Sequence, residues 1–247
     1  MIIKKLSLKE GAEQAEGVSV IIDVFRAFSC EPLMFYLGAK GILLESDVEK
    51  CLALQKSVDG ILVGEIDEEP IPGFHLTNSP YLILQKGEAY FRGRTVIHRT
   101  TSGVTGALMA FRKSSETLLG SFMTARAIAD YLKRLNPPLI SLVAMGIRSQ
   151  SKAPEDEACS HYIESLLTGK PFDMTQSLNA ILTHETSQKF LRGDKPYLPK
   201  EDVAISLQRD LFNFVLRATR HGEHLKAEPF HCQTINRTFT PALNLTS

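Results

Sequence analysis

The sequence has no tryptophan, little cysteine, no net charge and no long apolar run. Its four cysteines are too scattered to suggest a zinc site or a redox pair, so we expect reduced thiols. Lysine plus arginine and aspartate plus glutamate each total 28, which leaves no positive field to hold nucleic acid or an anionic membrane. No segment reaches the ~18 apolar residues of a membrane span, and the amino-terminal segment lacks the apolar stretch of a signal peptide.

These features favour a soluble, cytoplasmic protein in which any recognition of anions is local. Hydrophobic residues make up 43% of the chain, enough for a substantial core. No glycine- and serine-rich linker marks a boundary, so residues 1–247 are expected to form a single domain.

Strand-like and helical patterns alternate through most of the chain, which favours an α/β fold with a mainly parallel sheet covered on both faces. Regularity weakens beyond residue 170. The expected strands span residues 18–25, 41–45, 60–64, 94–98, 117–121, 139–145 and 212–219. The expected helices span residues 27–37, 47–57, 102–112, 124–135, 155–169 and 201–210.

The strand 18–25 is the most informative segment, because its apolar run delivers Asp23 and is followed by Arg26 where a helix begins. Ligands of open α/β sheets bind outside the carboxyl ends of strands. Asp23 could instead only cap the helix or pair with Arg26. A cation in the first helical turn opposes the helix dipole, so Arg26 is expected to have an anionic partner, either Asp23 or a substrate.

Three further segments place polar groups at strand ends or helix starts. Glu65 follows Gly64 at the end of an apolar run, and Glu155 and Asp156 open a helix. The turn at residues 100–103 offers hydroxyls, a glycine and helix-start N–H groups, which suit a phosphate or a sulfonate. Helix capping is the alternative for each segment.

Taken together, these segments form a pattern that resembles the 2-phosphosulfolactate phosphatase family of coenzyme M biosynthesis. The resemblance implies a three-layer α/β/α fold with a mainly parallel or mixed sheet. It also implies a Mg²⁺-dependent phosphatase that acts on a small sulfonated phosphoester. The segments that carry it are 22-IDVFRA-27, Gly64–Glu65, Gly73–Phe74 with 78-NSP-80, 100-TTSG-103 and 155-ED-156.

The chain departs from the family pattern where a substrate should lie. Phe28–Ser29 replaces a threonine pair, and His75, Thr77, Ser102 and Val104 replace an acid, a glycine, an asparagine and a threonine. The exact substrate therefore stays open. A non-catalytic binder of a phosphorylated or sulfonated metabolite is the second interpretation.

The resulting site hypothesis assigns Mg²⁺ to Asp23, Glu65 and Asp156, because magnesium prefers oxygen ligands. The expected catalytic residues are Asp23, Arg26, Thr101 and Ser102. The expected contacts with a small anionic phosphoester are Arg26, Asn78, Ser79, Thr100, Thr101, Ser102 and Gly103. The nucleophile stays open between Ser102, Thr101 and a metal-bound water, and His75 and His98 are interpreted as structural. The oligomeric state, including a homodimer, also stays open.

Overall fold

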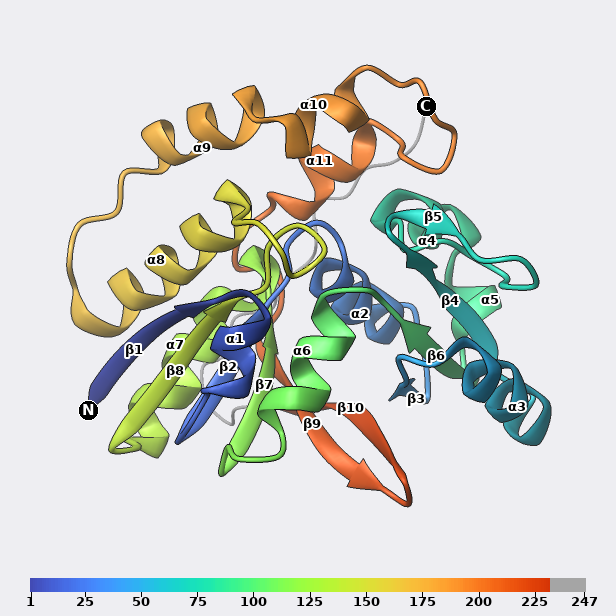
Figure 1. The fold of residues 1–247 in the computed structure, drawn as a ribbon, viewed down its shortest axis with the longest axis horizontal. Coiled ribbons are helices and arrows are strands. Elements are labelled where there is room, and N and C mark those ends of the chain that lie inside the picture. The colour runs from blue at the N-terminus through green and yellow to red at the C-terminus, as the bar shows by residue number, and fades with distance from the viewer. Residues whose placement is uncertain (232–247) are drawn as a thin grey trace.

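The computed structural model of the protein describes residues 1–231, which form one twisted sheet with helices on both faces (Figure 1). This is the three-layer α/β/α architecture expected from the resemblance, with a mixed sheet. Within the described residues, no helix is both long enough and apolar enough to cross a membrane.

The secondary structure of the described residues has the following bounds. The strands are β1 (Ile2–Ser7), β2 (Val18–Ile22), β3 (Gly41–Leu44), β4 (Ile61–Ile66), β5 (Glu69–Pro70), β6 (Thr95–Arg99), β7 (Glu116–Gly120), β8 (Leu139–Ala144), β9 (Phe214–His221) and β10 (His224–His231). The helices are α1 (Leu8–Glu13), α2 (Ala27–Tyr36), α3 (Val48–Val58), α4 (Pro80–Lys86), α5 (Glu88–Phe91), α6 (Gly103–Ala110), α7 (Ala125–Leu135), α8 (Pro154–Thr168), α9 (Met174–Thr183), α10 (Glu185–Leu191) and α11 (Glu201–Ser206), with a short 3₁₀ turn at Phe122–Thr124.

The sheet consists of two parallel groups joined by an antiparallel hairpin. Its strand order is β1-β8-β2-β7-β9-β10-β3-β6-β4-β5. Strands β1, β8, β2 and β7 pair in parallel, as do β3, β6 and β4. The hairpin β9–β10 pairs antiparallel with β7 on one side and with β3 on the other.

Because of the hairpin, the polar groups at the strand ends do not meet along one edge of a parallel sheet. A mainly parallel sheet would bring the acids together at one shared edge, but the pairing makes the two parallel groups run in opposite directions. Each strand step adds roughly 20–25° of twist, so the directions rotate strongly across the sheet. In Figure 1 the carboxyl ends of β2 and β8 and those of β4 and β6 approach the centre of the molecule from opposite sides.

Two helices cross between the parallel groups. Helix α2 leads from β2 to β3, and α6 leads from β6 to β7. Both helices therefore begin near the junction of the two groups, where α/β sheets commonly bind ligands.

The core lies on both faces of the sheet, as alternation along β2 shows. Ile21 packs in the cluster that contains α1, α2 and α6 residues, whereas Val20 and Ile22 pack in the cluster beneath α7 and α8. A smaller cluster under α3 contains Cys51 and residues of β3, β4 and β6.

Most of the expected elements are confirmed, with differences at both ends of the chain and between residues 66 and 94. The expected strand at 212–219 is confirmed as β9, but its partner β10 was not foreseen. The expected helix at 201–210 ends at Ser206. Strands β1 and β5 and helices α1, α4, α5, α9 and α10 were also missed. The cysteines Cys30, Cys51 and Cys159 are buried free thiols, and Cys232 lies outside the described residues.

We expect the β9–β10 hairpin to be essential for stability, because it joins the two groups. Leu216 on β9 is 0% exposed in the main core. The Leu216→Ala substitution should lower the free energy of unfolding by about 2–5 kcal/mol, measured by urea denaturation. The same substitution at Leu191, which is 42% exposed, should change it by no more than about 0.5 kcal/mol. Equal losses in the two variants would contradict this role.

Candidate active site

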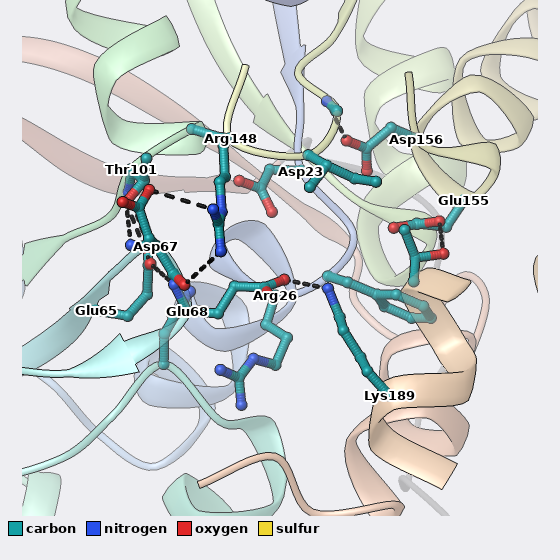
Figure 2. Close-up of a pocket in the computed structure, with 16 residues that line it drawn as sticks. Asp23, Arg26, Glu65, Asp67, Glu68, Thr101, Arg148, Glu155, Asp156 and Lys189 are labelled. Carbon is teal, nitrogen blue, oxygen red and sulfur yellow. Dashed lines mark hydrogen bonds and ion pairs between the residues drawn. The ribbon is translucent and has the colours of Figure 1, made fainter. Parts of the chain in front are cut away.

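A cleft of about 510 Å³, part of it open to solvent, lies at the junction of the two strand groups. Its lining comes from the ends of β2, β4, β6 and β8 and from α8 and α10 (Figure 2). The charged lining residues are six acids and three bases: Asp23, Glu65, Asp67, Glu68, Glu155, Asp156, Arg26, Arg148 and Lys189. The cleft is therefore predominantly acidic.

The carboxylate of Asp156 joins the ends of two strands. Its Oδ1 accepts a hydrogen bond from the Val24 amide at 2.7 Å, and its Oδ2 accepts one from the Gly146 amide at 2.8 Å. Asp23 follows β2 directly, and its Oδ1 accepts from the Ala27 amide at 3.1 Å. Both side chains are buried and face the same cleft.

Burial and mutual repulsion disfavour the charged forms of these acids. Burial, with a contribution from Glu65, raises the pKa of Asp23 to about 6. Burial raises the pKa of Glu155 to about 7, although a hydrogen bond from Thr186 opposes the shift. Burial, then repulsion from Asp23 and Glu155, raises the pKa of Asp156 well above its usual value. Such a group of carboxylates favours a bound cation.

Glu65 is held by the turn that precedes α6. Its Oε1 accepts from the Thr101 amide at 2.6 Å, and its Oε2 accepts from the Thr101 hydroxyl at 3.2 Å. The Thr101 hydroxyl also accepts from the Asp67 amide at 2.9 Å and from Arg99 Nη1 at 3.1 Å. Figure 2 shows Glu65 and Thr101 across the cleft from Glu155 and Asp156.

The turn before α6 does not provide the free anion cradle that the sequence analysis expected. The Thr101 amide is bound to Glu65, and the Gly103 amide is hydrogen-bonded to Asp23. The Val104 amide donates to Thr100 Oγ1 at 2.9 Å. The chain's own oxygens therefore occupy these donors. Thr101 and Ser102 line the cleft, whereas Thr100 and Gly103 are not among its lining residues.

The anionic partner of Arg26 is Asp202, not Asp23. Arg26 Nη1 lies 2.8 Å from Asp202 Oδ2 and donates to the Tyr197 carbonyl at 3.0 Å. In Figure 2 the guanidinium points away from Asp23 and Asp156. Asp202 Oδ1 also accepts from the hydroxyl of Ser79, which caps α4 and is not a lining residue. Asp202 was not foreseen as a site residue.

Asn78 lines the cleft and is held from behind by two buried side chains. Its Oδ1 lies 2.9 Å from His98 Nε2, and His98 Nδ1 lies 2.8 Å from Glu31 Oε1. His98 and Glu31 are both 0% exposed. This arrangement leaves Asn78 Nδ2 as a hydrogen-bond donor for a ligand. His75 accepts from the Leu62 amide at 2.9 Å, in accordance with a structural role.

Two basic residues in the cleft were missed by the sequence analysis. Arg148 follows β8 and lies 3.8 Å from Asp67, and Lys189 on α10 pairs with Glu68. Arg148 belongs to the segment 144–158 that the sequence singled out, whereas Lys189 falls where the regular pattern weakens. No local signal in the sequence distinguishes Lys189 from a surface lysine.

Comparisons with known proteins match nearly all of the described residues. The family model of 2-phosphosulpholactate phosphatase matches residues 4–221. A probable 2-phosphosulfolactate phosphatase from Bacillus subtilis is 30% identical over 210 residues, which cover 83% of this chain and 89% of that protein. The chain belongs to the 2-phosphosulfolactate phosphatase family.

Two other members of the family show similar relationships. The probable 2-phosphosulfolactate phosphatase from Carboxydothermus hydrogenoformans is 35% identical over 170 residues, or 68% of each chain. The protein of the same name from Clostridium acetobutylicum is 28% identical over 218 residues, or 85% of this chain and 89% of that protein. The phosphomonoesterase class follows from this membership.

The residues of the cleft fit a magnesium ion held by two carboxylates better than one held by three. Among residues 1–231, no three His, Cys, Asp or Glu side chains are grouped closely enough to hold a metal ion. Magnesium often uses only one or two carboxylates, with water and substrate oxygens completing its shell. Asp23 and Asp156 are buried, repel each other and offer hard oxygen donors. Since no group of three such side chains occurs among the described residues, the expected set of Asp23, Glu65 and Asp156 is not supported.

We expect the metal-free protein to lose stability as the pH rises from about 4 to about 7. In this window Asp23 and Glu155, with pKa values of about 6 and about 7, hold protons in the folded chain that the unfolded chain has released. Urea unfolding in a chelator at about pH 5 and about pH 7.5 measures the difference. Asp23→Asn should show a smaller loss than the wild type. An equal or larger loss in Asp23→Asn would contradict the assignment.

We also expect the Glu31–His98 pair to support the fold beneath Asn78. Glu31→Gln replaces the carboxyl group of a fully buried hydrogen-bonded pair and should cost about 1–3 kcal/mol in unfolding free energy. Glu10→Gln on the exposed surface of α1 is the matched control and should be near neutral. Chemical denaturation measures the free energy of unfolding of both variants, and equal values would show that the Glu31 carboxyl group is not needed for stability.

Proposed function

We propose that the protein is a magnesium-dependent phosphatase that hydrolyses a small anionic phosphoester, either 2-phosphosulfolactate or a close relative. The observation that carries the proposal is the pair of buried carboxylates, Asp23 and Asp156, at the base of a cleft in a chain of this family. The names of the related proteins support the substrate class. The altered positions around Ser29, Thr77 and Val104 are the reason for including close relatives.

In this proposal, Asp23 and Asp156 hold Mg²⁺ with the carboxylate lone pairs that their backbone hydrogen bonds leave free. When bound there, the ion supplies positive charge to the phosphoryl oxygens in the transition state. The two aspartates are fixed by amides of the β2 and β8 ends, so the positions of their oxygens are set before the substrate arrives. Such preorganisation avoids a reorganisation cost during the reaction.

Two other residues of the chain are suited to contact the phosphoryl group. Ser102 lines the cleft, and its hydroxyl makes no hydrogen bond within the described residues. Asn78 can donate through Nδ2, because its Oδ1 is bound to His98. The Thr101 hydroxyl is fully engaged with Glu65, Asp67 and Arg99, so Thr101 acts in positioning Glu65 and not as the nucleophile.

The test is phosphate release from a panel of small phosphoesters, with Mg²⁺ and with a chelator. We expect release only with Mg²⁺, and a loss of about 10²-fold or more in kcat for Asp23→Asn and for Asp156→Asn. Mg²⁺ should also raise the thermal midpoint of the wild type and have little effect on Asp23→Asn. Asp194→Asn is the matched control, since Asp194 is 67% exposed and lies outside the cleft lining.

The alternative, a non-catalytic binder of the same class of metabolite, gives a different result. It predicts a Mg²⁺-dependent thermal shift and binding of the phosphoester without release of phosphate from any member of the panel. If the protein neither binds nor hydrolyses any phosphoester of the panel, both functions are excluded.

A further inference from the structure

Two ion pairs cross the cleft between segments that are far apart in the sequence. Asp67 and Glu68 lie in the turn between β4 and β5, whereas Arg148 follows β8 and Lys189 lies on α10. Arg148 Nε lies 3.8 Å from Asp67 Oδ1, and its Nη2 donates to the Asp67 carbonyl at 3.4 Å. Lys189 Nζ donates to Glu68 Oε1. Figure 2 shows Lys189 reaching across the cleft to Glu68, and Arg148 extending into its middle.

The two cations differ from the third base of the cleft. Arg26 is neutralised by Asp202, a buried residue that does not line the cleft, and that pair is only 3% and 1% exposed. Arg148 and Lys189 instead pair with acids that line the cleft and are 52% and 31% exposed. Asp67 and Glu68 can therefore turn to solvent at low cost, because exposed ion pairs contribute little free energy.

A substrate with a second anionic group needs such cations. The cleft has twice as many acids as bases, and the amides at the start of α6 are occupied by Asp23 and Glu65. Lys189 has a side chain only 17% exposed, its Nζ lies 5.4 Å from the Phe190 ring centre, and it lowers the pKa of Glu155. Its ammonium group therefore lies near Glu155, the neighbour of Asp156 in the sequence, and in the same cleft as the two aspartates of the proposed metal site.

We propose that Arg148 and Lys189 form a second anion subsite, which binds the carboxylate or sulfonate of a substrate whose phosphoryl group lies at Asp23 and Asp156. In the free enzyme Asp67 and Glu68 occupy this subsite, and the substrate displaces them. The proposal rests on the phosphatase function proposed above. It selects phosphoesters whose alcohol carries a further anionic group over those whose alcohol is neutral.

The experiment compares 2-phosphosulfolactate with glycerol 2-phosphate, a secondary phosphoester without a second anion. Lys189→Met should lower kcat/KM for 2-phosphosulfolactate by about 10- to 100-fold, mainly through KM, because a charge-assisted contact is lost. This loss should exceed the loss for glycerol 2-phosphate by at least about tenfold. Lys195→Met is the matched control, since Lys195 is exposed and lies outside the cleft lining.

Glu68→Gln separates a subsite from a merely structural ion pair. Removing the competing carboxylate should lower KM for 2-phosphosulfolactate by about 3- to 10-fold, whereas loss of a structural pair would leave KM unchanged or raise it. This variant also covers the case in which Lys189→Met fails to fold.

The outcomes distinguish the subsite from the phosphatase function. Hydrolysis of both esters with similar kcat/KM, or equal losses for both in Lys189→Met, would overturn the subsite and leave the phosphatase standing. If neither ester is hydrolysed, the phosphatase function fails, and calorimetry with 3-sulfolactate then tests the subsite alone. Binding that is weakened in Lys189→Met and strengthened in Glu68→Gln supports it, and absence of binding overturns it.

Discussion

The structure of the cleft depends on the hydrogen bonds of one buried carboxylate, that of Asp156. It accepts from Val24 after β2 and from Gly146 after β8, and so satisfies two amides at strand ends that would otherwise need another partner. The same carboxylate lies in the field of Asp23 and Glu155. The contact that joins the strands thus also brings three carboxyl groups close together, and this crowding is the feature that supports the proposed cation site.

A second buried carboxylate, Asp202, holds together two segments that border the cleft. It accepts from Arg26 after β2 and from the Ser79 hydroxyl and the Tyr81 amide at the start of α4. A buried ion pair is weak evidence of net stability, because desolvation offsets its attraction. The contribution of this ion pair is to position segments of the chain, because the Asp202 hydrogen bonds connect helix α11 to two earlier segments that border the cleft.

The sequence predicted those site residues whose neighbours in the chain indicate a strand end or a helix start. Asp23 ends an apolar run and Asp156 opens a helix after Pro154, so a strand end and a helix start were enough to place both in the cleft. The parts that it missed depend on distant contacts. Arg26 and Asp202 are 176 residues apart, and Lys189 and Glu68 are 121 residues apart. Likewise, no local pattern indicates that β9 and β10 insert between two parallel groups and reverse their relative direction.

The start of α6 shows how the fold changes what a local motif suggests. Amides at a helix start attract anions, and the sequence 100-TTSG-103 suggests a phosphate. In the fold the anions are Asp23 and Glu65, and a Cβ at position 103 would lie 2.8 Å from Asp23 Oδ2, so only glycine lets that carboxylate approach. The helix start therefore orients acids that favour a cation. Under the proposed function, the positive charge that meets a phosphoryl group therefore comes from elsewhere in the cleft, from the proposed ion and from side chains such as Lys189.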